Sequence, residues 1–308
     1  MAPAPSKTLS SVFSYQSFVH AFSGACGGIV AMSTFYPLDT VRHHLQLEDP
    51  DKKKRSTFEV LQQIVKDEGF SSLYRGLIPV LQSLCISNFV YFYSFHSLKA
   101  LNASGSQYAM RDLLLGSLAG CINVMGTTPF WVVNTRLKMA DVRGEHRVGY
   151  DNLLDGLFYI ARNEGITALW AGAAAGLVLV INPAIQFMTY ESIKRRFLLN
   201  NKNVPAATSF AIGAIAKAVA TILTYPLQLV QTRLRHGTKG GNLPPNMGTI
   251  KMLLHILRTQ GAAGLFRGLE AKLLQTVLTA ALMFMTYEKI ATFVKSLLIK
   301  NTPKLIIK

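Results

Sequence analysis

Pro37-Leu38-Asp39-Thr40-Val41-Arg42 closes a long stretch without acidic or basic side chains, and it is the first copy of a pattern that occurs three times in the 308 residues. The pair Glu68-Gly69 and then Tyr74-Arg75-Gly76 complete the first copy. A fixed period indicates an architecture built from repeats, and three repeats fill this chain. Equivalent stretches begin at Pro129 and Pro226, and the glycine of the pair recurs every 96 residues, as Gly69, Gly165 and Gly261.

Composition indicates a membrane protein. Hydrophobic residues make up 50% of the chain and charged residues only 16%, against about 25% charged residues in ordinary soluble domains. The formal net charge of +16 fits either nucleic acid or an anionic membrane surface. Because Lys and Arg gather between the long uncharged stretches, we favour the membrane and expect no nucleic-acid partner. The three cysteines lie in apolar stretches without metal-ligand spacing, so we predict no metal site.

Six stretches are long and apolar enough to contain most of the roughly 20 residues that cross a bilayer. Four of them carry no Asp, Glu, Lys or Arg, the fifth carries only Lys217, and the sixth is shorter. We predict an all-α membrane protein with six transmembrane helices, two in each repeat. Short amphipathic helices are expected inside the repeats, over 58–66, 153–162 and 250–258. The six stretches are Thr8–Leu38, Gly76–Leu98, Leu113–Thr135, Gly165–Tyr190, Asn203–Thr232 and Leu273–Tyr287.

A proline closes the first span of each repeat. Pro37, Pro129 and Pro226 each remove a backbone donor, and we expect each to kink its helix. Three kinks at equivalent places would bring three helix ends together at one axis. The predicted segments are an N-terminal tail over 1–14, repeats over 15–103, 104–202 and 203–298, and a C-terminal tail over 299–308.

The sequence resembles the mitochondrial carrier family over nearly its whole length, from about Ser14 to Lys295. The family signature is Pro-x-Asp/Glu-x-x-Lys/Arg followed by an acidic-glycine element and an aromatic-basic-glycine element, three times over. The resemblance implies a threefold pseudo-symmetric helix bundle around one central substrate site. It also implies that this site opens alternately to the two sides of the membrane, between two gates made of charge pairs.

The gate on the odd-numbered spans departs from the family signature. Its acidic places hold one carboxylate, and its basic places hold one guanidinium. The family's pairing therefore leaves no complete ion pair at this end, and polar hydrogen bonds are expected to close it. The implied contacts are Asp39 with Asn134, Trp131 with Gln231, and Gln228 with Arg42.

The second gate of the family is an aromatic-acid-x-x-base element on each even-numbered span. An acid and a base three positions apart share one helix face. The family's pairing leaves one full ion pair in this chain, between Glu288 and Lys99. In the other two places His96 meets Lys194, and Glu191 meets Ala291.

Two lysines indicate the charge of the substrate. Lys217 and Lys272 lie inside or at the edge of spans, where a lone cation is costly and usually serves a transport path. Lys217 also stands where the third repeat should hold the second glycine of a packing pair such as Gly116 and Gly120. We expect Lys217 to contact a substrate phosphate. For Lys272 a phosphate contact and a headgroup contact stay open.

Within the family, the chain resembles most the peroxisomal branch that carries adenine nucleotides and related cofactors, in the stretches 87–93, 182–187 and 270–278. The positions at which the family contacts its substrate, one in each repeat, fall at Ser83, Leu179 and Gln275. Amide side chains near these positions could read the edge of a base. The predicted substrate-binding residues are Lys217, Lys272, Gln275, Asn88, Asn182, Gln186, Ser83 and Leu179.

The leading hypothesis is a peroxisomal membrane carrier that exchanges ATP, ADP or AMP, CoA, FAD or NAD, with these cofactors as cargo and none bound permanently. The alternative is a mitochondrial inner-membrane carrier for FAD, folate or pyrimidine nucleotides. A transport-inactive scaffold is disfavoured by the intramembrane Lys217. No catalytic constellation is present, so we do not expect an enzyme.

The expected partners follow from this reading. They are the lipid bilayer, small phosphorylated substrates and a peroxisomal membrane-protein import receptor. The first fifteen residues lack the pattern of a matrix presequence, so we expect internal targeting signals, for which the basic loop 52–55 is a candidate. We expect the carrier to be a monomer.

Overall fold

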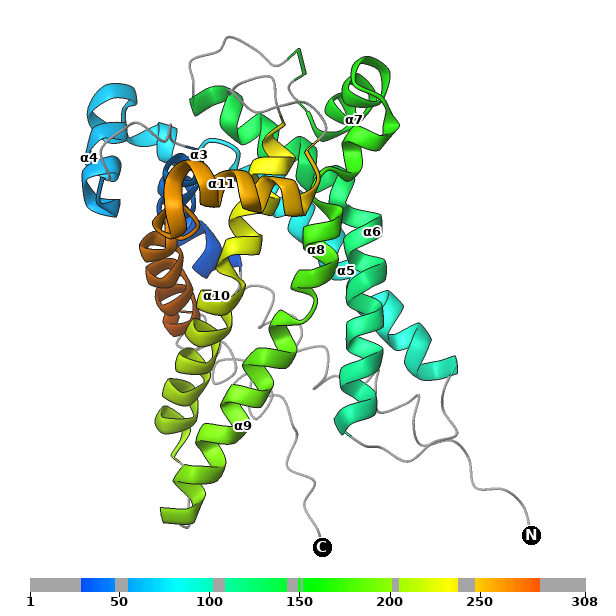
Figure 1. Cartoon of the computed structure of the whole chain (residues 1–308), viewed down its shortest axis with the longest axis vertical. Helices are drawn as coiled ribbons and strands as arrows, with labels where there is room; N and C mark the ends of the chain where they lie inside the picture. The colour runs from blue at the N-terminus through cyan, green and yellow to red at the C-terminus, as the bar shows by residue number, and fades with distance from the viewer. Residues whose placement is uncertain are drawn as a thin grey trace, which may run out of the picture. The chain divides into compact units, whose positions relative to one another are not determined.

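The computed structural model describes residues 29–47, 55–101, 109–142, 149–150, 152–200, 205–237 and 247–282. All regular structure within these residues is helical, as the sequence predicts (Figure 1). The chain divides into two compact units, one over Pro37–Leu274 and the other over Met1–Tyr36 with Gln275–Lys308. Every contact described below lies within the Pro37–Leu274 unit.

The helices alternate between long apolar ones and short amphipathic ones. Residues 269–282 form a further helix after those named here. The elements are α3 (Tyr36–Leu47), α4 (Thr57–Glu68), η1 (Phe70–Tyr74), α5 (Leu77–Leu101), α6 (Ala109–Val142), α7 (Leu153–Asn163), η2 (Ile166–Trp170), α8 (Ala173–Leu179), α9 (Asn182–Asn200), α10 (Ala206–His236) and α11 (Thr249–Gly264).

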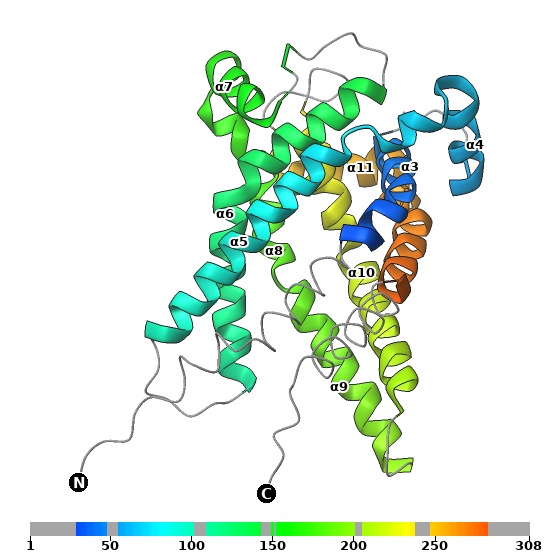
Figure 2. The same cartoon turned by 180° about the vertical axis from the view of Figure 1, so that it is seen from behind.

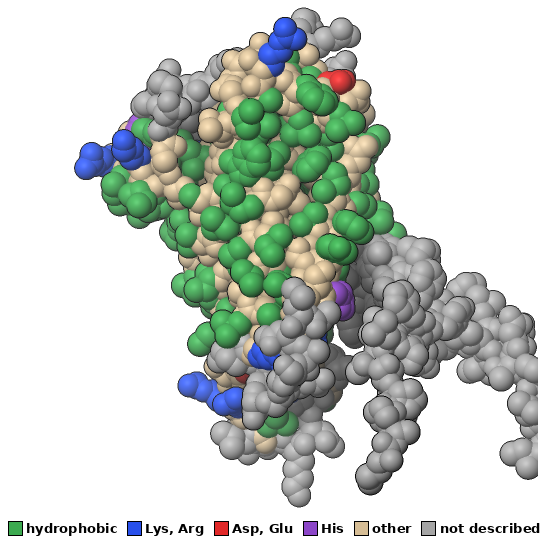
Figure 3. Space-filling view, turned by 90° about the vertical axis from the view of Figure 1, so that its right-hand side faces the viewer, with side chains coloured by type: hydrophobic (Ala, Val, Ile, Leu, Met, Phe, Trp, Pro, Cys, Tyr) green, Lys and Arg blue, Asp and Glu red, His purple; other side chains and the backbone are tan. Residues whose placement is uncertain are grey.

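Four helical stretches within the described residues are long and apolar enough to cross a membrane, which fits the second to fifth predicted spans. The predicted first and sixth spans lie partly outside the described residues. On the face seen in Figure 3, apolar side chains cover the middle, and Lys and Arg lie toward the two ends. The four stretches are Phe70–Lys99, Arg111–Lys138, Ile166–Leu198 and Thr208–His236.

The 96-residue period of the sequence is also the period of the core. Each repeat has one buried apolar cluster, which joins its amphipathic helix to the helix of its first span, namely α3, α6 or α10. One isoleucine of each amphipathic helix occupies the same place, 5% exposed or less, and it packs on the leucine that follows the glycine turn. These residues are Ile64, Ile160 and Ile256, and Leu73, Leu169 and Leu265.

The three predicted amphipathic helices are confirmed as α4, α7 and α11. The first begins with a capping box, in which the Ser56 side chain accepts from the Glu59 N–H and the Glu59 carboxylate accepts from the Ser56 N–H. Each of the three helices buries one apolar face and leaves other large apolar side chains exposed, such as Phe158 and Ile250. This pattern is typical of helices at a membrane surface.

Proline does not end the long helices of the second and third repeats. Pro129 lies inside α6, which continues to Val142, and Pro226 lies inside α10, which continues to His236. The fourth span is instead divided, because α8 ends at Leu179 and α9 begins at Asn182. The backbone tightens at this break, where the N–H of Val180 donates to the carbonyl three residues earlier. Pro183 accounts for the break, since it cannot donate to the preceding turn.

The long helices form two pairs, in which α5 packs along α6 and α9 packs along α10. The two pairs meet near the amphipathic helices and diverge toward the other ends of α6 and α9, in both views (Figures 1 and 2). The divergence places the two predicted gates at ends of different character, one closely packed and one spread.

Candidate functional site

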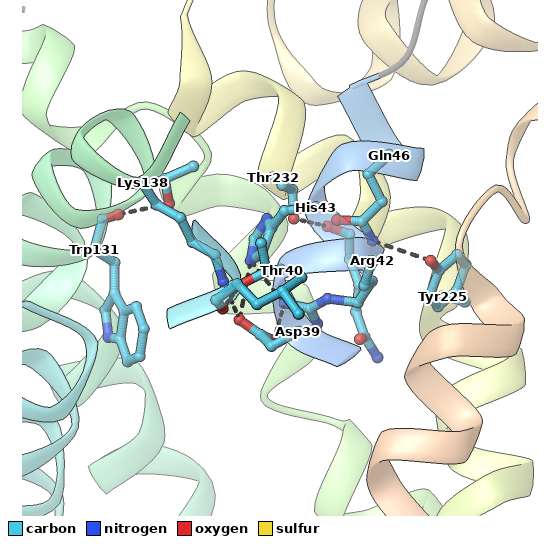
Figure 4. Close-up of polar contacts among 12 residues, drawn as sticks. Asp39, Thr40, Arg42, His43, Gln46, Trp131, Lys138, Tyr225 and Thr232 are labelled. Atoms are coloured by element: carbon cyan, nitrogen blue, oxygen red, sulfur yellow. Dashed lines mark hydrogen bonds and ion pairs between the residues drawn. The ribbon is translucent and has the colours of Figure 1, made fainter. Parts of the chain in front are cut away.

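The packed end of the unit holds a polar cluster around Asp39 of α3 (Figure 4). Its Oδ2 lies 2.6 Å from the Nζ of Lys138 on α6, and its Oδ1 lies 2.8 Å from Arg42 on its own helix. The Nε2 of His43 lies 3.6 Å from Oδ2. Asp39 is 5% exposed and Lys138 is 2% exposed. This ion pair between two repeats is therefore shielded, and salt screens such a pair far less than a surface one.

The pair of Asp39 and Lys138 corrects the expectation for this gate. Asp39 was expected to face Asn134, and no complete ion pair was expected to remain at this end. The actual partner stands one helical turn beyond Asn134. Helical side chains lean toward the N-terminus of their helix, so the long lysine stem reaches back to the level of Asp39. The family signature gives this lysine no role, and sequence reasoning missed it.

The second expected contact, Trp131 with Gln231, is also replaced. The guanidinium of Arg235 on α10 lies over the Trp131 ring, 5.8 Å from its centroid. Gln231 instead lies against α8, where a Cβ added at Gly176 would be 2.7 Å from its amide nitrogen. The placement of Arg235 over Trp131 is that of a cation–π contact.

The third expected contact, Gln228 with Arg42, is absent from the described contacts of either side chain. The Gln228 amide donates to Thr224 Oγ1 of its own helix at 3.0 Å. Arg42 is used by Asp39 and also lies 2.8 Å from the Nε2 of His43. A side-chain hydrogen bond between these two repeats instead runs from the Gln46 amide to the Tyr225 hydroxyl, at 3.0 Å (Figure 4).

Two arginines, which sequence reasoning did not single out, tie the second repeat to the third and the third repeat to the first. Arg136 pairs with Glu164 of its own repeat at 2.7 Å and donates from Nε to the carbonyl of Arg235 at 3.2 Å. In the third repeat, Arg233 donates to the Gln260 side chain at 3.1 Å and from Nε to the carbonyl of Gln46 at 2.9 Å. Each guanidinium therefore links the amphipathic-helix motif of its own repeat to the end of the first-span helix of the next repeat. The acidic-glycine element supplies the receiving side chain.

Glycine permits the close approach of neighbouring helices at this end. Gly268 has φ +79°, and a Cβ there would lie 3.0 Å from the Tyr225 hydroxyl and 3.2 Å from the Arg42 carbonyl oxygen. Gly172 has φ +80°, and a Cβ there would lie 3.1 Å from the Gln231 carbonyl oxygen. The last glycine of the aromatic-basic-glycine element therefore lets the next helix start directly against a helix of another repeat.

The two lysines of the predicted substrate site are half-buried. Lys217 lies on α10, and Lys272 lies on the helix over 269–282. The charge of Lys272 interacts electrostatically with Arg42, Asp39, Lys138 and Lys217. Arg42, Lys138 and Lys272 therefore act on the carboxylate of Asp39, and Lys217 acts on Lys272.

The remaining predicted binding residues are dispersed. The Asn182 amide donates to Thr224 Oγ1 at 2.7 Å, which ties the start of α9 to α10. Asn88 is exposed on α5 and Gln186 is half-buried on α9, while Ser83 is buried on α5. Gln275 belongs to the other compact unit. Gln275 is therefore not counted among the residues of this site.

A cavity of about 490 Å³ draws its lining from all three repeats. Tyr91 and Phe95 of α5 form one wall, with their rings nearly parallel and their centroids 6.4 Å apart. Leu179, a predicted contact residue, lies in the opposite wall. The other lining residues are Asp112, Leu113, Gly116, Ser117, Gly120, Asn123, Val124, Gly176, Val180, Pro183, Ala184 and Gln231.

The gate elements on the second span of each repeat, which include those on α5 and α9, are not joined to one another within the described residues. Lys99 lies 3.2 Å from Asp112 of the adjacent α6, and Lys194 lies over the ring of Tyr190 at 5.4 Å. No described hydrogen bond joins His96 to Lys194. Glu191 pairs only weakly along its own helix, 3.7 Å from Arg195. Glu288 lies outside the described residues.

One closed end, one spread end and a cavity lined by three repeats define a membrane carrier. A family model described as mitochondrial carrier protein matches residues 14–104, 105–201 and 202–297. The chain belongs to the mitochondrial carrier family. It is accordingly a transporter and not an enzyme, and the family implies the six-span fold.

Several relatives are peroxisomal proteins. Peroxisomal membrane protein PMP34 of Mus musculus is 50% identical, over 92% of this chain and 96% of the relative. The peroxisomal nicotinamide adenine dinucleotide carrier of Arabidopsis thaliana is 34% identical, over 92% and 98%. Peroxisomal membrane protein PMP47B of Candida boidinii is 29% identical, over 94% and 89%. The prediction of a multi-pass protein of the peroxisomal membrane is confirmed.

Proposed function

We propose that this peroxisomal membrane carrier exchanges phosphorylated cofactors that contain adenine, namely ATP, ADP or AMP, CoA, FAD and NAD, by alternating access. The observation that carries the proposal is the excess of cations at the closed end of the transport path. An anionic group of the substrate would balance it.

The phosphate end of the substrate is assigned to Lys217 and Lys272. Lys217 lies within a membrane-spanning stretch, and Lys272 lies at the edge of the predicted sixth span. The charge of Lys272 also interacts with Arg42 and with the carboxylate of Asp39. A cation in such a place is costly, and the negative charge of a phosphate beside it would offset that cost. A lysine ammonium acts here as a point charge rather than as a planar fork.

The adenine end is assigned to the cavity lined by Tyr91, Phe95 and Leu179. Its volume of about 490 Å³ falls within the range of about 300–1,000 Å³ that is usual for small-molecule sites. Its walls are mostly apolar, with Asp112 and Asn123 as acceptor and amide groups that can read the edge of a base. Aromatic rings offer a stacking surface for a planar base.

The relatives support this substrate class. One relative, 34% identical, is a peroxisomal nicotinamide adenine dinucleotide carrier. Another, 32% identical, is named as nicotinamide adenine dinucleotide transporter 2, mitochondrial. NAD contains both an adenine and two phosphates, the two groups for which this chain offers separate contacts.

Uptake into liposomes tests the proposal. The purified carrier is reconstituted with each labelled compound in turn, namely AMP, ATP, CoA, FAD and NAD, with folate and UTP as the alternative class and adenosine as a base without phosphate. We expect exchange of at least one adenine compound with phosphate and none of adenosine. Preferential transport of folate or UTP would favour the alternative, and equal transport of adenosine would remove the phosphate from recognition.

Two further proposals concern partners. We propose that the carrier acts as a monomer, because the cavity draws its lining from all three repeats of one chain. We also propose that an import receptor for peroxisomal membrane proteins recognises internal basic segments, including the loop 52–55, of which only Arg55 belongs to the described residues. Imaging of a tagged chain with residues 52–55 neutralised would show loss of peroxisomal labelling if that loop carries the signal.

A further inference from the structure

Two contacts at the closed end share a register that the family signature does not contain. Asp39 stands two residues after the proline of the first repeat, and its partner Lys138 stands nine residues after the proline of the second. Trp131 stands two residues after its proline, and its partner Arg235 stands nine residues after the proline of the third. The same displacement therefore occurs at two of the three interfaces between repeats.

The places five residues after the proline, where the family carries its bases, have other uses here. Asn134 is 3% exposed, and its Oδ1 accepts no hydrogen bond. Gln231 packs into the space left by Gly176. No described contact joins Asn134 to Asp39 on α3, or Gln231 to Trp131 on α6. The long basic side chains one turn further along reach the level of Asp39 and Trp131, because helical side chains lean toward the N-terminus.

We propose that Lys138 and Arg235 are the gate residues that hold this end of the transport path closed. Lys138 does so through the buried carboxylate of Asp39, and Arg235 does so through the ring of Trp131. The third interface has the neutral Gln46 at the equivalent place, bonded to the Tyr225 hydroxyl. The gate is therefore kept in this chain, with its basic residues one helical turn beyond the places that the signature gives them.

The backbone around the displaced contacts is fixed independently of these side chains. The carbonyl groups of Arg235 and Gln46 accept hydrogen bonds from Arg136 and Arg233 of the neighbouring repeats. Thr40 of α3 donates to the carbonyl of Leu73 at 2.8 Å. Opening of this end must therefore separate Lys138 from Asp39 and also break the bonds of Arg136 and Arg233 that cross between repeats. Removal of the lysine should act on the closed state more than on the fold.

Accessibility of a cavity residue tests the gate without any substrate, so its outcome is separate from that of the transport proposal. The three native cysteines are changed to serine, and Leu179→Cys provides one thiol in the cavity. The carrier is reconstituted in a single orientation, and a membrane-impermeant maleimide is supplied either outside or sealed inside the vesicles. The parent is expected to react from one side only.

With Lys138→Gln we expect the reaction from the closed side to accelerate about tenfold, which corresponds to a loss of ~1.4 kcal/mol of closing free energy. Arg235→Gln should act in the same direction. Lys138→Arg should keep the reaction slow, and Lys251→Gln, which removes an exposed lysine of α11, should leave it unchanged. The double variant Asp39→Asn with Lys138→Gln should react no faster than Lys138→Gln alone, because both changes remove one contact.

The double variant also guards against misfolding, because it leaves no unpaired carboxylate in the buried place. The proposal fails if Lys138→Gln and the double variant both react like the parent. It fails equally if Asn134→Ala accelerates the reaction as much as Lys138→Gln, since the family's own register would then close the gate. Reaction of the parent from both sides would show that this end is not closed at all.

Discussion

The indole N–H of Trp170 donates a hydrogen bond of 2.9 Å to the backbone carbonyl of Met125. This carbonyl is four residues before Pro129, so it is the one that the proline leaves without its helical donor. The aromatic residue of the aromatic-basic-glycine element therefore repairs the helix that the proline interrupts. The relationship explains how α6 continues through Pro129 to Val142.

We predict that Trp170→Phe lowers the melting temperature of the carrier in detergent. The change leaves the Met125 carbonyl without its donor, at a cost of about 1–3 kcal/mol for a buried group and less where water reaches it. Pro129→Ala restores the helical N–H, so Trp170→Phe should cost little in a Pro129→Ala background. An equal loss in both backgrounds would mean that Trp170 acts through packing alone.

Gly268→Ala should destabilise the packed end. The residue adopts φ +79°, and the added Cβ would lie 3.0 Å from the Tyr225 hydroxyl, so strain and crowding add to a backbone cost of about 1–2 kcal/mol. The matched control is Gly213→Ala in α10, where no atom lies within 4 Å of an added Cβ. Thermal unfolding in detergent should show a clear loss for Gly268→Ala and none for Gly213→Ala. Similar melting temperatures for the two variants would contradict the close approach.

Lys217→Ala should reduce the uptake of every phosphorylated substrate into liposomes, and Lys217→Arg should retain part of it. The physical reason is that the ammonium supplies charge to the phosphate, which the arginine also supplies with a different shape. Lys217→Gly should melt no lower than the parent while still losing transport. Lys66→Ala on the exposed face of α4 is the control. Normal uptake by Lys217→Ala would move the phosphate site to Lys272.

At the spread end we predict that Glu288→Gln alters exchange kinetics more than Glu191→Gln. Glu191 makes only a 3.7 Å contact with the largely exposed Arg195, and such surface pairs contribute about 0–1 kcal/mol. Glu288 is instead assigned to a gate with Lys99. Exchange rates in liposomes would compare the two variants under the same substrate gradient. Equal small effects would show that this gate has been misassigned.

The sequence by itself determined the repeats and the helices. The period of 96 residues places Ile64, Ile160 and Ile256 at one position of three amphipathic helices, and all three are buried in equivalent clusters. Such local patterns are readable because a helix buries one face at a fixed spacing. The apolar stretches likewise predicted long helices, since length and hydropathy alone decide which segments can span a bilayer.

Only the tertiary structure decided the partners at the gate. The signature predicted that Asp39 would meet Asn134, whereas Asp39 meets Lys138. A repeat period fixes which helices are neighbours, but it does not fix the height at which two side chains from different repeats meet. That height depends on the reach and tilt of each side chain and on what fills the place one turn earlier. Here the Oδ1 of Asn134 accepts no hydrogen bond from the described residues, and the longer lysine one turn beyond it makes the contact with Asp39.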